Sequence, residues 1–211
     1  NEFDVEKIKA RLLKDKVKLI EIQRSKGYST RKSLTIDKVK NILRQTHLSN
    51  HGRRENDAEH SWHMAVMAYL LKEYANKKGI YIIGDIPIYV AYDSADVWSN
   101  PKQFLLDENL KPSAVAGCPP DAFSEDGQLW GNPLYNWDYH GTTDFEWWTN
   151  RLAAAAELYD IIRIDHFRGF ESFYAIPYGK EDATEGEWMK GPNCTLFYNI
   201  EEKLGRLNLI A

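Results

Sequence analysis

The sequence predicts an α/β fold, in which parallel strands and helices follow a short all-helical segment. Three short apolar runs are typical of strands buried on both faces of a parallel sheet, namely 80–83, 161–165 and 207–211. Helical patterns lie between them, at 145–158 and 196–204, so strands and helices alternate in this part of the chain. The first 76 residues, in contrast, show apolar residues only at helical spacing.

Three helices are expected in this first segment. Apolar residues recur at helical spacing over 5–22, 36–46 and 58–75, and Lys, Arg and Glu fill most other positions of the first range. The stretch 26–30 contains Gly and polar residues and marks a break between the first two helices. The segment is therefore expected to be all-helical.

Charge divides the chain near residue 76. Residues 1–76 hold 16 Lys and Arg against 10 Asp and Glu, whereas residues 77–211 hold 11 against 21. This contrast indicates two units of different origin, a helical unit at 1–76 and an α/β unit at 77–211. A basic unit could meet phosphates, but a solvated helix face is the simpler interpretation, so no nucleic-acid partner is expected.

Composition excludes several classes of protein. A hydrophobic content of 43% and an aromatic content of 13% are typical of a globular chain rather than a disordered one. No apolar run approaches the length that spans a bilayer, and the first residues lack a signal-peptide pattern, so no membrane association is expected. Cys118 and Cys194 form no spacing motif, which favours reduced thiols in the cytoplasm.

Two aspartates lie at the carboxyl ends of the first two predicted strands. Because strand side chains alternate between faces, Asp85 shares a face with Tyr81 and Ile83, and Asp165 shares one with Arg163. Catalytic groups collect at this end of barrel strands. We expect Arg163 to lower the pKa of Asp165 and keep it ionised, as a nucleophile for sugar transfer requires. The alternatives are a helix cap or turn for each Asp, and a structural ion pair for Arg163.

Aromatic residues are dense between the first two predicted strands. They are Tyr89, Tyr92, Trp98, Phe123, Trp130, Tyr135 and Trp137. Core packing is the better interpretation for any one of them, but their density after a strand end also suggests platforms on which sugar rings stack. A connection of more than about fifty residues is itself typical of a functional segment or of one with structure of its own.

Longer motifs in this half carry a family resemblance. The stretches are 84–90 (GDIPIYV), 93–98 (DSADVW), 119–121 (PPD), 127–135 (GQLWGNPLY), 163–170 (RIDHFRGF) and 190–192 (KGP). Together they resemble the amylomaltase, or disproportionating-enzyme, family of 4-α-glucanotransferases. The resemblance runs from about residue 71 to residue 211, and the stretch 163–170 is its most specific part.

The resemblance implies a TIM (β/α) barrel, of which this chain would hold about three of eight strands. It also implies retaining transfer of α-1,4-glucan segments without a cofactor, with maltooligosaccharides as partners. Asp165 would be the nucleophile and Arg163 its support. The residues that would contact the sugars are Asp85, Phe123, Trp130 and His166.

One departure from the family pattern bears on activity. Retaining transfer needs a second carboxylate as acid and base, and in the family it directly follows the strand that resembles 207–211. The sequence stops at Ala211, and three strands cannot close a barrel. We therefore expect a truncated chain that is inactive alone, with self-association through uncovered barrel edges. A non-catalytic, glucan-binding fragment is the alternative.

The stretches 43–46 and 53–65 carry a second resemblance, to HD-domain phosphohydrolases of the 5′-nucleotidase type, over about 34–76. His60 would match the first ligand of their divalent metal. The later His-Asp pair and distal Asp do not follow, so a metal would be needed only if this part were complete. A solvated or helix-packing His60 is the simpler interpretation, and a phosphohydrolase fragment is the alternative function.

Overall fold

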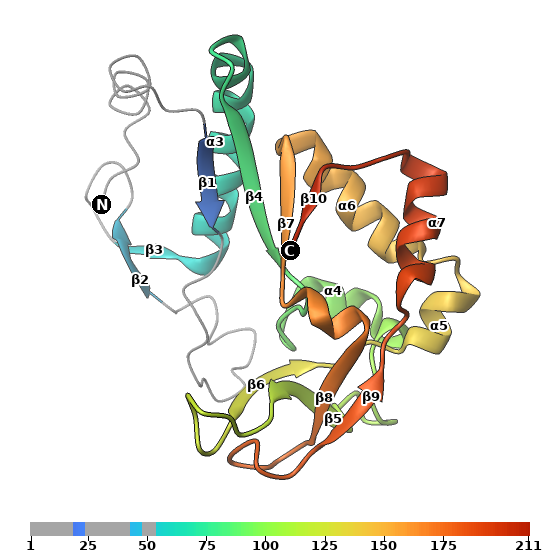
Figure 1. The fold of residues 1–211 in the computed structure, drawn as a ribbon. Helices are drawn as coiled ribbons and strands as arrows, with labels where there is room; N and C mark the ends of the chain where they lie inside the picture. The colour runs from blue at the N-terminus through green and yellow to red at the C-terminus, as the bar shows by residue number, and fades with distance from the viewer. Residues whose placement is uncertain (1–18, 24–42, 48–53) are drawn as a thin grey trace.

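The computed structural model describes residues 19–23, 43–47 and 54–211, with side chains from residue 65 onward. Two four-stranded sheets and one two-stranded sheet lie within these ranges. In Figure 1 the first four-stranded sheet lies in the upper part of the molecule, with helices beside it, and the second lies below it.

The first sheet is parallel throughout, and its spatial order follows the order of the chain. Its strands are β1 (Leu19–Gln23), β4 (Tyr81–Pro87), β7 (Ile161–Asp165) and β10 (Leu209–Ile210). Each strand after the first adds to the same side of the sheet, as in a (β/α) barrel. The predicted strands at 80–83, 161–165 and 207–211 are confirmed as β4, β7 and β10, and β1 is a fourth.

Three long helices cover one face of this sheet. They are α3 (Asp57–Lys77), α6 (Glu146–Leu158) and α7 (Cys194–Leu204), and they confirm the predictions at 58–75, 145–158 and 196–204. On β4, Ile82 packs with Ala68 and Leu71 of α3. On β7, Ile162 and Ile164 join a larger core with α6 and α7. In β4 and β7 the even-numbered residues thus face the helices, which leaves the odd-numbered ones on the opposite face.

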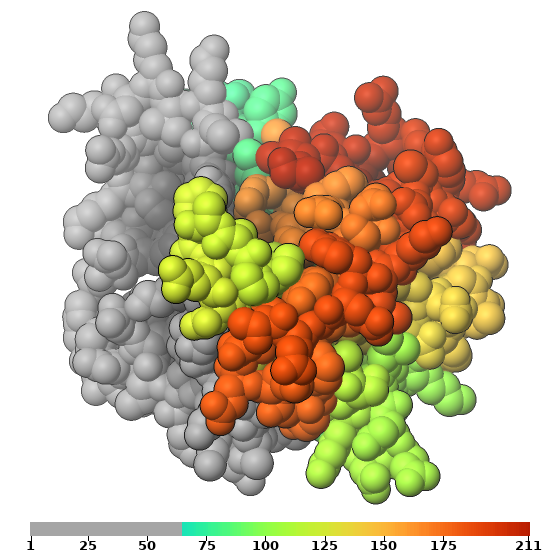
Figure 2. All heavy atoms as spheres, turned by 60° about the horizontal axis from the view of Figure 1, so that its bottom comes forward, coloured from blue at the N-terminus to red at the C-terminus, as the bar shows by residue number. Residues whose placement is uncertain are grey.

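The second sheet is antiparallel, and sequence reasoning missed it. Its strands, in the order β6-β5-β8-β9, are β5 (Ala114–Cys118), β6 (Gln128–Pro133), β8 (Ser172–Pro177) and β9 (Glu187–Lys190). Two strands come from the long connection before β7 and two follow β7, and they meet on the face shown in Figure 2. Short helices complete this region, namely α4 (Ala95–Ser99), η1 (Pro101–Gln103), α5 (Trp137–Thr142) and η2 (Phe167–Phe170).

The all-helical expectation for the first segment holds for α3 but is wrong for the described parts of the other two predicted helices. Residues 19–22, expected in a helix over 5–22, belong to β1 and pair with β4. Residues 43–46, expected in a helix over 36–46, belong to β2 (Leu43–His47), which pairs with β3 (Arg54–Asn56). The rest of both predicted helices lies outside the described residues. Short apolar runs fit either period, and pairing with a distant strand decides between them.

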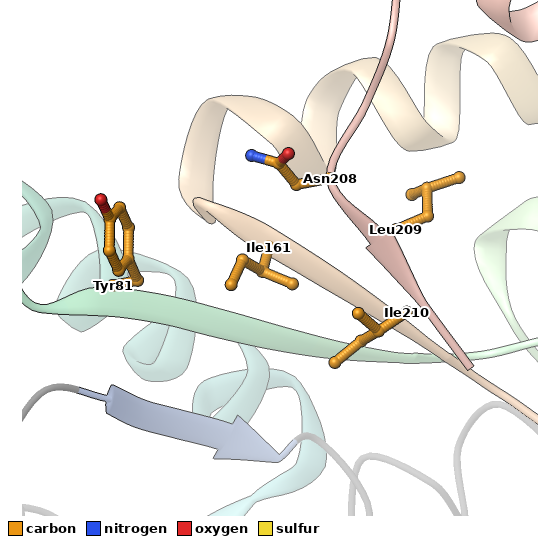
Figure 3. Close-up of a pocket in the computed structure, with 5 residues that line it drawn as sticks. All are labelled: Tyr81, Ile161, Asn208, Leu209 and Ile210. Carbon is orange, nitrogen blue, oxygen red and sulfur yellow. The ribbon is translucent and has the colours of Figure 1, made fainter.

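A groove of about 380 Å³ lies along the amino-terminal ends of the parallel strands. Figure 3 shows its lining residues, which come from β4, β7, β10 and the residue before β10: Tyr81, Ile161, Asn208, Leu209 and Ile210. Tyr81 and Ile161 occupy odd positions, so the groove opens on the face that the helices do not cover. Within the described part of the chain, none of the helices combines the length and apolar character that crossing a bilayer requires.

Candidate active site at the ends of the parallel strands

Three charged side chains meet at the carboxyl ends of β4 and β7. Asp85 pairs with Arg163 in the register of the two strands, so their side chains lie on the same face. The Arg163 guanidinium donates from Nη1 to Oδ1 of Asp85 over 2.6 Å and from Nη2 to Oδ1 of Asp165 over 3.0 Å. The structure thus brings these three sequence-predicted residues together.

The two carboxylates differ in exposure. The side chain of Asp85 is 5% exposed and that of Asp165 is 29% exposed, while Arg163 between them is 34% exposed. The hydrogen bond to Asp85 raises the pKa of Arg163 above its ordinary value, so the guanidinium stays charged. Sequence reasoning assigned Arg163 to Asp165 alone, whereas its shorter contact is to Asp85. Asp85 thus anchors the cation, and Asp165 is the more accessible of the two carboxylates.

Directly after Asp165 the chain turns sharply. His166 has φ 55° and ψ 45° and occupies the N-cap position of η2, without a side-chain capping bond. The helix-cap alternative for Asp165 is therefore wrong, because His166 takes that position. Burial lowers the pKa of His166, which favours a neutral imidazole at neutral pH.

An aromatic wall stands beside the carboxylates, formed by Tyr89, Trp130 and His166. The Trp130 and His166 rings meet edge to face with centroids 4.7 Å apart. The Tyr89 ring lies 6.2 Å from Trp130 and 6.5 Å from His166. Asn132 on β6 donates to the backbone oxygen of Val90 over 2.8 Å, so β6 is held against the segment that follows β4. This contact brings Trp130 of the second sheet to the strand ends of the first.

Phe123 lies at solvent, in the turn between β5 and β6. Its side chain is 97% exposed, and Oδ1 of Asp121 accepts hydrogen bonds from the backbone N–H groups of Phe123 and Ser124. The structure thus brings Asp85, Asp165 and the aromatic wall together but does not pack Phe123 against them. An exposed phenyl ring on an ordered turn remains available to a ligand.

Most of the other aromatics in the long connection fill the core. Tyr135 is 1% exposed, and its ring contacts Trp137 and Trp148 with centroids 5.0 and 5.5 Å away. Trp98, by contrast, is 78% exposed. The core interpretation is confirmed for Tyr135, while the Trp130 ring contacts that of His166, the residue after Asp165.

Sequence reasoning missed Arg151 of α6, which reaches over to the end of β4. Its guanidinium donates to the backbone oxygens of Pro87 and Ile88. The signal in the sequence was a cationic residue among Trp147, Trp148 and other apolar positions of a helix that packs on a sheet.

No three His, Cys, Asp or Glu side chains gather as metal ligands in the part of the chain whose side chains are described. The side chain of His60, the residue that the HD-domain resemblance singles out, lies outside that part.

Two family models match the chain, and neither is an HD domain. The model described as methionine gamma-lyase matches residues 1–51. The model described as 4-alpha-glucanotransferase matches residues 32–211, so the two matches overlap at 32–51. The HD-domain resemblance therefore stays a prediction.

Curated relatives agree with the larger match. The 4-alpha-glucanotransferase of Clostridium butyricum is 61% identical over 142 residues, which cover 67% of this chain and 29% of the relative. The enzyme of that name from Thermus thermophilus is 52% identical over 141 residues, which cover 67% of this chain and 28% of the relative.

Solved structures match the fold as well. Amylomaltase from Streptococcus agalactiae in complex with acarbose is 49% identical with a TM-score of 0.68, covering 74% of this chain and 31% of the other. Amylomaltase from Corynebacterium glutamicum, 18% identical with a TM-score of 0.58 over 81% of this chain and 24% of the other, supports the fold alone. The chain thus spans less than a third of the length of these relatives. With 180 of its 211 residues inside the family model and its strands arranged as part of a barrel, the chain belongs to the 4-alpha-glucanotransferase family.

Proposed function

We propose that this chain carries the nucleophile-bearing part of a 4-α-glucanotransferase active site. The reaction is transfer of an α-1,4-glucan segment with retention, through a covalent glucosyl-enzyme. One observation carries the proposal: a single guanidinium holds the buried Asp85 and the accessible Asp165 at the open ends of two parallel strands.

The roles follow from exposure and charge. Asp165 attacks the anomeric carbon of the donor sugar, the glycosidic bond breaks, and a glucosyl ester forms; the 4-hydroxyl of an acceptor glucan then displaces the carboxylate. Arg163 keeps Asp165 oriented. The sugar rings contact Trp130, Phe123 and His166, and Asp85 holds sugar hydroxyls at the edge of the site. Carboxylate chemistry of this kind needs no cofactor.

A retaining mechanism also needs a second carboxylate, about 5 to 5.5 Å from the nucleophile, as acid and base. Asp85 is unsuited to this role because Arg163 stabilises its anion. We propose that the acid/base group belongs to the part of the family fold that this chain does not match, so the 211 residues alone bind glucan without turnover.

A chimera tests the catalytic assignment. Replacing the matching 142 residues of the Clostridium butyricum relative with those of this chain should preserve disproportionation of maltotriose. Asp165→Asn in the chimera should lower the rate by at least about 10³-fold, as loss of a nucleophile does. Asp182→Asn, at an exposed aspartate in the loop before β9, is the matched control and should leave the rate unchanged. A folded chimera that stays active with Asp165→Asn would refute the assignment.

Calorimetric titration of the 211-residue chain with maltoheptaose separates binding from turnover. Binding that Trp130→Ala weakens, without maltotriose disproportionation, is the expected result. The absence of any heat of binding would contradict glucan binding by this part of the site.

We further propose that residues 1–76 and 77–211 have different origins, supported by their opposite net charges.

A cytoplasmic location is in keeping with two free cysteines, Cys118 and Cys194.

A further inference from the structure

We infer that Arg151, on helix α6, is a positioning residue for the carboxylate site. Its contacts fix the backbone at the end of the strand that carries Asp85. The inference rests on the proposed function for its consequence in glucan binding, and on contacts alone for its effect on Arg163.

Arg151 clamps the chain just after β4. Its Nη2 donates to the backbone oxygen of Pro87 over 2.6 Å, and its Nη1 donates to that of Ile88 over 3.1 Å. The Tyr135 hydroxyl donates to the same Ile88 oxygen over 2.7 Å. Hydrogen bonds from a charged donor are stronger than neutral ones, and here they satisfy two carbonyls at the point where the strand ends.

The guanidinium is itself held in place. Its central carbon lies 4.8 Å from the centre of the Trp148 ring and 5.4 Å from that of Trp147. Trp148 is fully buried. Contact with two nearly perpendicular rings limits the positions open to the guanidinium, which favours the one from which it meets the carbonyls.

The clamped residues border the site on two sides. Pro87 pairs with Asp165 across the β4–β7 register, and Asp85 lies two residues earlier on the same strand face. A shift of Pro87 would therefore move the Asp85 carboxylate relative to Arg163. In the other direction, Ile88 leads into Tyr89 of the aromatic wall.

The segment at Pro87 and Ile88 is tightly packed. A side chain at Gly169 would overlap Ile88 and crowd Tyr89 and His166, so η2 packs directly on the clamped segment. A displacement of Ile88 would be transmitted to His166 on one side and to Asp85 on the other, because dense packing leaves no gap to absorb it.

The test compares the full 211-residue chain with Arg151→Gln and Arg151→Lys by NMR of the Arg163 side chain and by titration with maltoheptaose. In Arg151→Gln, hydrogen exchange of the Arg163 guanidinium should accelerate about tenfold and affinity should fall about tenfold, since small displacements in a preorganised site have effects of at least this size. Arg151→Lys keeps the positive charge but loses the paired N–H donors of the guanidinium, so intermediate exchange rates and affinities are expected.

Lys72→Gln is the matched control. Lys72 on α3 is also a cation that donates to backbone oxygens of a neighbouring element, those of Ala156, Glu157 and Tyr159, but at the other end of α6. It should lower the thermal midpoint without changing the Arg163 signals or the affinity.

Unchanged Arg163 signals in folded Arg151→Gln, or equal changes in Lys72→Gln, would overturn the inference. If Arg151→Gln does not fold, Arg151→Lys decides the same question. Failure of the unsubstituted chain to bind maltoheptaose would instead count against the proposed function, and the Arg163 signals would still test the positioning role.

Discussion

His140 is a titratable side chain enclosed by aromatic rings. None of it is exposed, and its ring Nε2 lies 3.1 Å from the backbone oxygen of Gln103. The rings of Tyr135, Trp137 and Trp147 surround it, with centroids 5.4, 5.2 and 6.0 Å away. Burial lowers the pKa of His140 to about 4, because an imidazolium there would lose its hydration.

We expect the free energy of unfolding to fall as pH decreases below 6.5, the ordinary pKa of histidine. Between pH 6.5 and about 4, His140 is protonated in the unfolded chain but stays neutral in the folded chain. This contribution is complete above pH 6.5, and about 3 kcal/mol of it is lost by pH 4. His166 acts in the same direction, since burial lowers its pKa too.

Urea unfolding across this pH range measures the effect. His140→Gln removes the ionisable group and can still donate to the Gln103 oxygen, so its stability should depend less steeply on pH. An equally steep decrease in the variant would assign the acid sensitivity to other groups.

At this scale, strand alternation predicted that Arg163 lies beside Asp165, because a period of two fixes which side chains of a strand share a face. It did not predict the shorter contact of Arg163 to Asp85 on the neighbouring strand. The hydrogen bonds of Arg151 and Tyr135 were not predicted, because their acceptors are backbone carbonyls more than forty residues away in sequence. No local pattern encodes such a partner. The assignment of Trp130 to the site came from the family resemblance rather than from spacing.

The strands and helices of the barrel part were predictable because burial gives each of them a clear apolar pattern. β7 is apolar at both faces except for Arg163 and Asp165, and α6 carries a run of alanines that favours helix. The antiparallel sheet was missed because its strands are short, and β5 pairs with β8 more than fifty residues later in the chain. β1 has an apolar run too short to distinguish a strand from a turn of helix.

Gly84 shows how closely β4 and α6 approach each other, and it yields a prediction. A Cβ added at Gly84 would overlap the ring of Tyr159, which follows α6. We expect Gly84→Ala to lower the free energy of unfolding by about 1–3 kcal/mol, the usual cost of overpacking a core. Chemical denaturation of the 211-residue chain measures this difference.

Gly141 of α5 is the control for Gly84, because a Cβ there meets nothing within 4 Å. Gly141→Ala should be neutral or stabilise by up to about 1 kcal/mol, since alanine favours helix. The double variant Gly84→Ala with Tyr159→Ala should cost less than the sum of the two single variants if the clash is the cause. Simple additivity would point to another cause for the loss at Gly84.

On the scale of the whole molecule, β4 connects the parallel sheet with the antiparallel sheet. Its even positions lie under helices, its odd positions carry the site and the groove, and the segment after it joins the antiparallel sheet through Asn132. The open face is the consequence of having four parallel strands among the described residues, where a closed barrel of this family has eight.

This open face predicts self-association of the 211-residue chain. Tyr81, at the groove, is 57% exposed, and Ile210 of β10, the outermost strand on that side among the described residues, is 43% exposed. Apolar surface next to an unpaired strand edge favours pairing between copies. Sedimentation velocity should therefore show mass increasing with concentration. Tyr81→Lys places a charge in the groove and should shift the chain toward monomer, whereas Tyr198→Lys, at a 69% exposed tyrosine on α7, should not. A chain that stays monomeric at every concentration, with a sharp thermal transition independent of concentration, would show that the face is covered within the molecule.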